Sequence, residues 1–159
     1  MAYHRGNAFL TNVTADNLRT SWRSWEPTII DPYASLVVNP FTHAKYFNTR
    51  NFVVVSLNLR INFSNATPIP YSTISVRLPD TLQVRAGTFF RNQGIVERET
   101  HTAERKFSVC NITVDGETQG GVDGTTYLYL DRLFIQNLGQ FIAGQTYEFK
   151  GQITFEPSV

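Results

Sequence analysis

The chain has little cysteine, little charge and no long apolar run. Its 159 residues include one cysteine and 17% charged residues, with a formal net charge of +1. A single cysteine excludes an intrachain disulfide, and the near-neutral charge offers no basic surface for nucleic acid. No segment approaches the roughly 20 apolar residues of a membrane helix, and the first residues lack the apolar core of a secretory signal. We therefore expect no nucleic-acid partner, no membrane partner and no signal peptide.

Metal-binding patterns are missing too. The three histidines are scattered along the chain, at His4, His43 and His101. Zinc sites need several thiolate or imidazole ligands at short spacing, which this set does not supply. Residues 115–124 form a Gly-rich loop with three acidic side chains, Asp115, Glu117 and Asp123. Because the spacing is not that of a calcium-binding EF-hand loop, we predict an ordinary loop, no metal site and no cofactor.

Catalytic motifs are also lacking. There is no Gly-X-Ser-X-Gly nucleophile elbow and no phosphate-binding glycine loop that leads into a helix. Glycoside hydrolysis needs two carboxyl groups about 5 to 9.5 Å apart, and residues 97–106 offer Glu97, Glu99 and Glu104. Arginine and lysine residues stand beside these carboxylates, which favours a solvated charged turn. We predict that the protein is not an enzyme and has no catalytic residues.

The chain does contain regular alternation of apolar and polar residues. Within residues 51–64, every second position is apolar: Val53, Val55, Leu57, Leu59, Ile61 and Phe63. A period of two predicts a strand with one buried face. At about 3.3 Å per residue this strand would span roughly 40 Å, which is longer than the usual strand of about five or six residues. Such a strand indicates an elongated β-sandwich.

Residues 25–159 repeat this pattern in short runs separated by breakers, so we predict one all-β antiparallel domain. About eight strands are expected, at residues 35–38, 43–48, 52–63, 72–78, 86–97, 107–114, 125–136 and 145–156. The fifth should be interrupted by a bulge or tight turn at residues 92–94. The sixth changes its apolar parity near Cys110, which indicates a bulge there or burial on both faces. Gly151 should leave room for a neighbouring aromatic ring or a kink.

Residues 1–24 differ from the rest because their apolar residues are too few to build a core. Ordering such a segment costs about 1 to 2 kcal/mol per residue in backbone entropy, so contacts from outside must compensate. We predict an N-terminal anchoring arm that binds a partner through Phe9, Leu10, Val13, Leu18 and Trp22. The alternative is that the arm folds back along its own domain.

Four segments together carry a family resemblance: residues 25–28 (WEPT), 44–46 (AKY), 74–79 (ISVRLP) and 144–156 (GQTYEFKGQITFE). In this order they resemble the β-sandwich modules of tailed-bacteriophage virion proteins, found in tail fibres, receptor-binding tips and head spikes or decoration proteins. The resemblance covers roughly residues 22–156. Where such modules often carry a glycine turn before the long strand, this chain has residues 47–51 (FNTRN).

The resemblance implies a jelly-roll-like β-sandwich, a homotrimer, and a location in the virion. The leading hypothesis is a trimeric capsid decoration protein, a cement or head-spike protein, that is anchored by its arm to the major capsid protein or another virion protein. The alternative is the receptor-binding head domain of a tail fibre, which would contact host surface glycan through the loops at residues 97–106 and 115–124. A third hypothesis is a depolymerase fragment that uses Glu97 or Glu99.

Exposed aromatic rings are the other candidates for glycan contact, because flat rings supply a large contact area at low entropic cost. Five residues are candidates for this role: Tyr33, Phe89, Phe90, Tyr127 and Tyr129. We expect most of them to lie in the core or in subunit contacts.

Overall fold

The computed structural model describes residues 22–65, 73–85, 87–99, 106–115, 127–131 and 141–158. These residues form an antiparallel all-β fold, which confirms the predicted fold class. Its strands are β1 (Arg23–Ser24), β2 (Thr28–Ile29), β3 (Ala34–Leu36), β4 (His43–Asn48), β5 (Val53–Phe63), β6 (Thr73–Arg77), β7 (Phe89–Glu99), β8 (Lys106–Asp115), β9 (Tyr127–Asp131) and β10 (Thr146–Phe155). Within these ranges, the fold has no helix with the length and apolar character needed to cross a bilayer.

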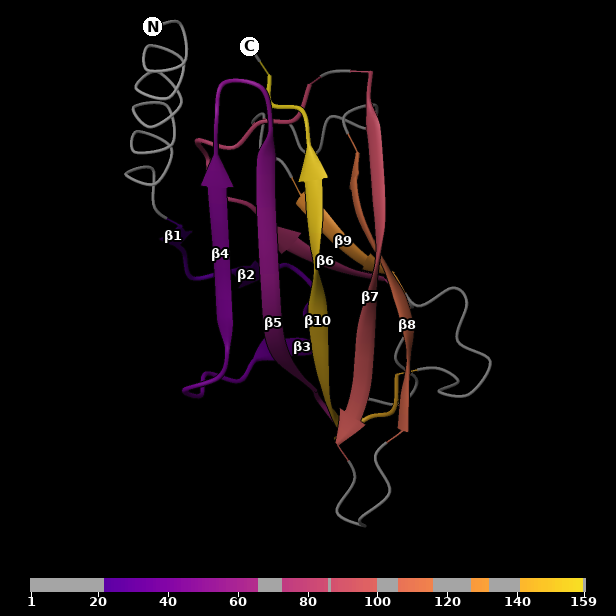
Figure 1. Ribbon diagram of the computed structural model, residues 1–159. Helices are drawn as coiled ribbons and strands as arrows, with labels where there is room; N and C mark the ends of the chain where they lie inside the picture. Colours follow the sequence, from indigo (N-terminus) through magenta and orange to yellow (C-terminus); the bar gives the residue numbers. More distant parts are fainter. Residues whose placement is uncertain are drawn as a thin grey trace, which may run out of the picture.

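All of these strands belong to one curled sheet. Their order is β1-β4-β5-β10-β7-β8-β9-β6-β2, and β3 pairs with β5 as a side branch. The sheet curls so that β6 and β9 lie across the core from β5 and β10 (Figure 1). Residues 28–36 link the two halves, because β2 pairs with β6 while β3 pairs with β5. The fold is thus a half-barrel whose halves face each other as the layers of a sandwich do.

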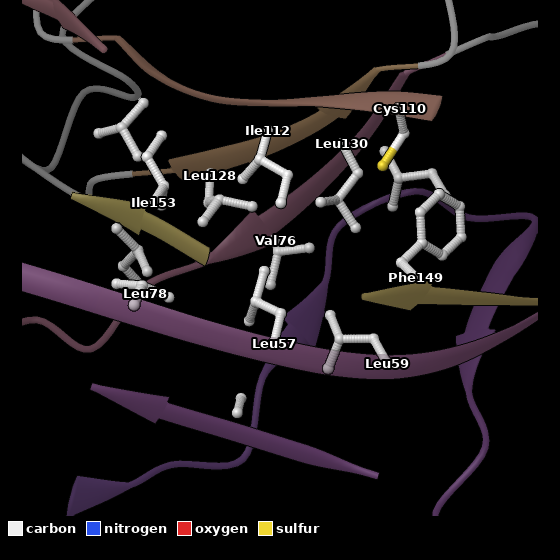
Figure 2. Packing of buried hydrophobic residues seen from close by; sticks show 14 of the residues in the cluster. Leu57, Leu59, Val76, Leu78, Cys110, Ile112, Leu128, Leu130, Phe149 and Ile153 are labelled. Atoms are coloured by element: carbon white, nitrogen blue, oxygen red, sulfur yellow. The ribbon is translucent and has the colours of Figure 1, made fainter. Parts of the chain in front are cut away.

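The core is built from the inward positions of the long strands. In β5, every second residue is buried, as the alternation predicts. β10 continues this inner face, since Phe149 pairs with Leu59 in the neighbouring strand. Figure 2 shows residues of the other half that point toward this face: Val76, Ile112, Leu128 and Leu130. Burying each such side chain contributes about 1.5 to 3 kcal/mol, so the facing halves hold each other in place.

The interruption predicted at residues 92–94 is wrong. β7 runs through them, and its residues pair without a break with β8 from Arg98 to Phe89. Gly94 is needed for a different reason: a Cβ at this position would lie 2.6 Å from the carbonyl oxygen of Lys150 and 2.8 Å from Cδ1 of Ile112. The glycine therefore permits close packing across the sheet and does not break the strand.

Gly151 lies next to Gly94 and also makes room for Ile112. The neighbour that fills the space is aliphatic, so the predicted aromatic neighbour is wrong. The pairing of β10 with β5 continues through Gly151, which lies opposite Leu57, so the strand shows no break there.

The parity change in β8 comes from burial on both faces and not from a bulge. Ten consecutive residues of β8 pair with β7. Cys110, Ile112 and Val114 face the core, so the free thiol is buried. Asn111 and Thr113 are buried on the other face, whereas Val109 is 46% exposed there.

Candidate functional site

Most of the residues predicted to bind a partner lie outside the described part of the chain: Phe9, Leu10, Val13 and Leu18. Trp22 is described and is 46% exposed. Its ring centroid lies 6.3 Å from that of Phe47, which in turn lies 6.3 Å from that of Phe52. These three rings, the hairpin aromatic cluster, cover the outer side of the β4–β5 hairpin. The arm's contact with another molecule stays a prediction.

The charged segment at residues 97–106 is in part a strand. Residues 97–99 belong to β7 and Lys106 begins β8, so the interpretation as a turn is wrong for these four residues; residues 100–105 lie outside the described part. Glu97 pairs in register with Glu148 of β10. Both carboxylates approach the ammonium group of Lys150, at 3.9 and 3.1 Å. A shared lysine cation compensates the two negative charges, which is a structural arrangement of a sheet surface.

The second predicted contact loop, residues 115–124, falls outside the described part except for Asp115 at the end of β8. Among the described residues, no group of three His, Cys, Asp or Glu side chains is placed to hold a metal ion.

The predicted aromatic candidates do not form one surface. Tyr33 is 37% and Phe89 50% exposed, whereas Phe90 packs against the core and lies 6.3 Å from Phe155. The guanidinium of Arg91 lies over the Phe89 ring, 5.3 Å from its centroid. Tyr129 is partly buried, and nothing is described of the Tyr127 side chain.

A polar hollow, which the sequence did not reveal, lies where three connections meet. This hairpin-end hollow has a volume of about 460 Å³ and is lined by Asn48, Thr49, Arg50, Asp80, Thr81, Gln83, Pro157 and Ser158. The residues come from the end of β4 and the β4–β5 turn, from the segment after β6 and from the segment after β10. These connections gather at the end of the half-barrel where the carboxyl-terminal segment leaves β10 (Figure 1).

Hydrogen bonds hold the β4–β5 turn in one conformation. Thr49 Oγ1 accepts hydrogen bonds from the backbone N–H groups of Asn51 and Phe52, at 3.2 and 3.1 Å. The backbone N–H of Thr49 donates to the carbonyl of Phe52 at 2.9 Å. Threonine and asparagine stabilise turns by such local bonds, so the positions of Asn48 and Arg50 are fixed by the turn.

The opposite wall of the hollow is equally well held. Leu82 is buried in the core, and its backbone N–H donates to the carbonyl of Pro79. The backbone N–H of Ser158 donates to the carbonyl of Gln83 at 2.7 Å. Val84 and Pro157 form an isolated β-bridge. These contacts attach the carboxyl-terminal segment to the segment that follows β6.

The polar side chains of the hollow are largely unused by the fold. In the described part of the chain, five of them make no hydrogen bond or ion pair: Asn48, Arg50, Thr81, Gln83 and Ser158. Asp80 differs, because its carboxylate accepts a hydrogen bond from the Arg77 guanidinium at 2.9 Å. The hollow therefore offers one unpaired cation, several amide and hydroxyl groups, and one compensated carboxylate.

A second hollow, of about 540 Å³, lies over β7 and β8 and is lined by Arg91, Asn92, Gln93, Val109 and Asn111. Two of its polar side chains, Asn92 and Arg91, are already engaged. The Asn92 side chain donates to the carbonyl of Gln152 and accepts from the backbone N–H of Gln93, while Arg91 lies over Phe89. Engaged groups must give up existing contacts to bind a ligand. The hairpin-end hollow has more polar side chains without such contacts, so it is the stronger candidate.

No protein-family model and no curated protein matches the chain. In structure, the chain is similar to the carboxy-terminal domain of the turkey type 3 siadenovirus fibre, in its avirulent form complexed with 3-sialyllactose. The two chains share 8% sequence identity with a TM-score of 0.45, over 86% of this chain and 99% of the fibre domain. A likeness this weak carries no argument about ligand or role.

Proposed function

We propose that this chain is a non-enzymatic domain of a virus particle that attaches the particle to its host, with the hairpin-end hollow as the contact surface. The observation that carries the proposal is the hollow itself, in which unengaged polar side chains stand on hydrogen-bonded connections at one end of a rigid half-barrel. Because the backbone that bears these side chains is already held, a ligand would need to order only the side chains. The resemblance of residues 22–156 to tailed-bacteriophage virion modules supports a place in the virion.

The test locates the chain and measures attachment. Antibodies against the purified protein are used to label intact particles in electron microscopy, and the soluble protein is added to host cells before the particles. We expect label at a fibre or tail tip and a dose-dependent loss of particle adsorption. Label in the head lattice, with unchanged adsorption, would overturn the proposal.

Capsid decoration by an arm-anchored homotrimer remains the other prediction, and the same experiment decides between the two. A decoration protein places the label over the head and leaves adsorption unchanged. Mass measurement of the isolated protein gives the number of copies independently of either role.

A further inference from the structure

We infer that the hairpin-end hollow binds a carbohydrate that carries a carboxylate, with Arg50 as the partner of the acidic group. The inference rests on the proposed attachment role and names the ligand class of that surface.

The charges of the hollow select an acidic ligand. Arg50 is exposed and, among the described residues, forms no ion pair. The Asp80 carboxylate is compensated by Arg77 at 2.9 Å, so it does not neutralise the Arg50 cation. Guanidinium groups bind carboxylates with two parallel hydrogen bonds, and this planar geometry suits arginine better than lysine. The strongest interaction that the hollow offers is therefore with an anion.

The remaining groups select a polyhydroxylated ligand. The amides of Asn48 and Gln83 each offer donors and an acceptor, and the hydroxyls of Thr81 and Ser158 can act as either. Sugar hydroxyls need both kinds of partner within a short distance. An apolar ligand would leave these groups without hydrogen bonds, and that desolvation is unfavourable. One arginine also gives too few phosphate contacts for a nucleic-acid strand.

The size and rigidity of the hollow agree with a small ligand. Its volume of about 460 Å³ falls in the range of small-molecule sites, about 300 to 1,000 Å³. Asn48 and Arg50 flank Thr49, whose hydroxyl holds the turn, so both stand on a fixed backbone. Gln83 and Ser158 are joined by a backbone hydrogen bond of 2.7 Å. The backbone that carries the ligand-binding side chains thus keeps its spacing before a ligand arrives.

The experiment is saturation-transfer NMR on the purified full chain with matched sugars. Glucuronic acid and glucose differ in the carboxylate, and N-acetylneuraminic acid and galactose extend the acidic and neutral series. Inorganic phosphate tests for a simple anion site. We expect saturable binding of an acidic sugar with a Kd no weaker than about 1 mM, and weaker binding of neutral sugars. The inference would be overturned if neutral sugars bind as tightly as acidic ones. It would also be overturned if phosphate binds and no sugar does, or if no sugar binds at all.

Three variants assign the binding to the hollow. Arg50→Ala should weaken binding of the acidic sugar by about tenfold or more, because a hydrogen bond to a charged group is lost, and Arg50→Lys should weaken it less. Arg91→Ala removes an arginine from the second hollow, and Phe52→Ala removes a ring from the hairpin aromatic cluster. Neither should change the Kd. Binding that survives Arg50→Ala but is lost in Arg91→Ala would place the site over β7 and β8.

The sugar-binding experiment and the adsorption experiment can give opposite results, so each proposal can be refuted without the other. If the soluble protein blocks adsorption but binds no acidic sugar, the attachment role stands and the ligand class is wrong. If it binds an acidic sugar through Arg50 but does not affect adsorption, the site is real and the attachment role is wrong.

Discussion

Asp31 is a half-buried carboxylate between β2 and β3, the segment that links the two halves of the sheet. Burial raises its pKa above the ordinary value of 3.8, and a hydrogen bond from the backbone N–H of Ser75 at 2.9 Å opposes this rise only in part. The folded state therefore binds the proton more tightly than the unfolded state does. It follows that the carboxylate lowers stability as pH rises through the window from 3.8 to the raised folded value.

Asp31→Asn tests this sign, because asparagine keeps an oxygen that can accept from Ser75 and does not titrate. As pH rises from about 3 to about 7, the free energy of unfolding of the wild type should fall relative to that of the variant. The whole of this difference should develop between these two pH values. Urea denaturation at a series of pH values measures the difference. A wild type that gains stability relative to Asp31→Asn as pH rises would show that the hydrogen bond outweighs burial.

Gly151→Ala should destabilise the fold by about 1 to 3 kcal/mol, because the added methyl collides with Cδ1 of Ile112. Ile112→Val removes that Cδ1 atom, so the double variant should recover part of the loss. Chemical denaturation of the four proteins in the double-mutant cycle gives the coupling free energy, expected at about 0.5 kcal/mol or more.

Gly94→Ala is the matched control for this cycle. The added methyl there also meets the carbonyl oxygen of Lys150, which Ile112→Val leaves in place. The second substitution should therefore rescue Gly94→Ala less than Gly151→Ala. Equal rescue at both positions would mean that the β10 backbone shifts to accommodate the methyl.

Among the elements, the β4–β5 turn connects stability with the proposed binding surface. Thr49→Val removes the hydroxyl that accepts from Asn51 and Phe52, while Thr49→Ser retains it. We expect a loss of about 1 kcal/mol for the valine variant and a smaller loss for the serine variant. Denaturation gives the free energies, and amide hydrogen exchange at Phe52 reports whether the turn opens. A valine variant as stable as the wild type would show that the Thr49 hydroxyl does not hold the turn.

The strands were predictable where one face is buried and apolar and polar residues alternate regularly along the strand. β4 matches its predicted range, and β5 and β10 match within one residue at each end, because their alternation is uninterrupted. β7 was predicted poorly because Gly94 was interpreted as a breaker, whereas the glycine serves a close approach to Lys150 in another strand. That requirement comes from a partner about 56 positions away, so no local pattern contains it.

At the scale of the whole molecule, the sheet order and the hollow could not be predicted. β10 lies between β5 and β7, and the residues of the hollow come from three connections far apart in the sequence. In the sequence, Asn48 and Arg50 belong to a short link that lacks the expected glycine turn, and nothing marks them as binding residues. Single polar residues in short loops carry no signal until the fold brings them together.

Removing residues 1–21 tests the predicted arm while keeping β1, which pairs with β4. Every residue of the described core cluster lies outside the removed segment, so we expect a folded protein with unchanged near-ultraviolet circular dichroism. If the arm is an anchor, the truncated protein should no longer be incorporated into particles. Loss of the folded spectrum would show that the segment belongs to the domain, and normal incorporation would show that it is not the anchor.

The position of β10 has a consequence for biosynthesis. β5 and β7 each pair with β10 and not with each other. The sheet therefore lacks the strand that joins them until residues 146–155 have been synthesised. The ribosome must therefore release nearly the whole described chain before the half-barrel can close. Nascent chains that stop before β10 would expose the apolar faces of two long strands, which makes chaperone binding or degradation their expected fate.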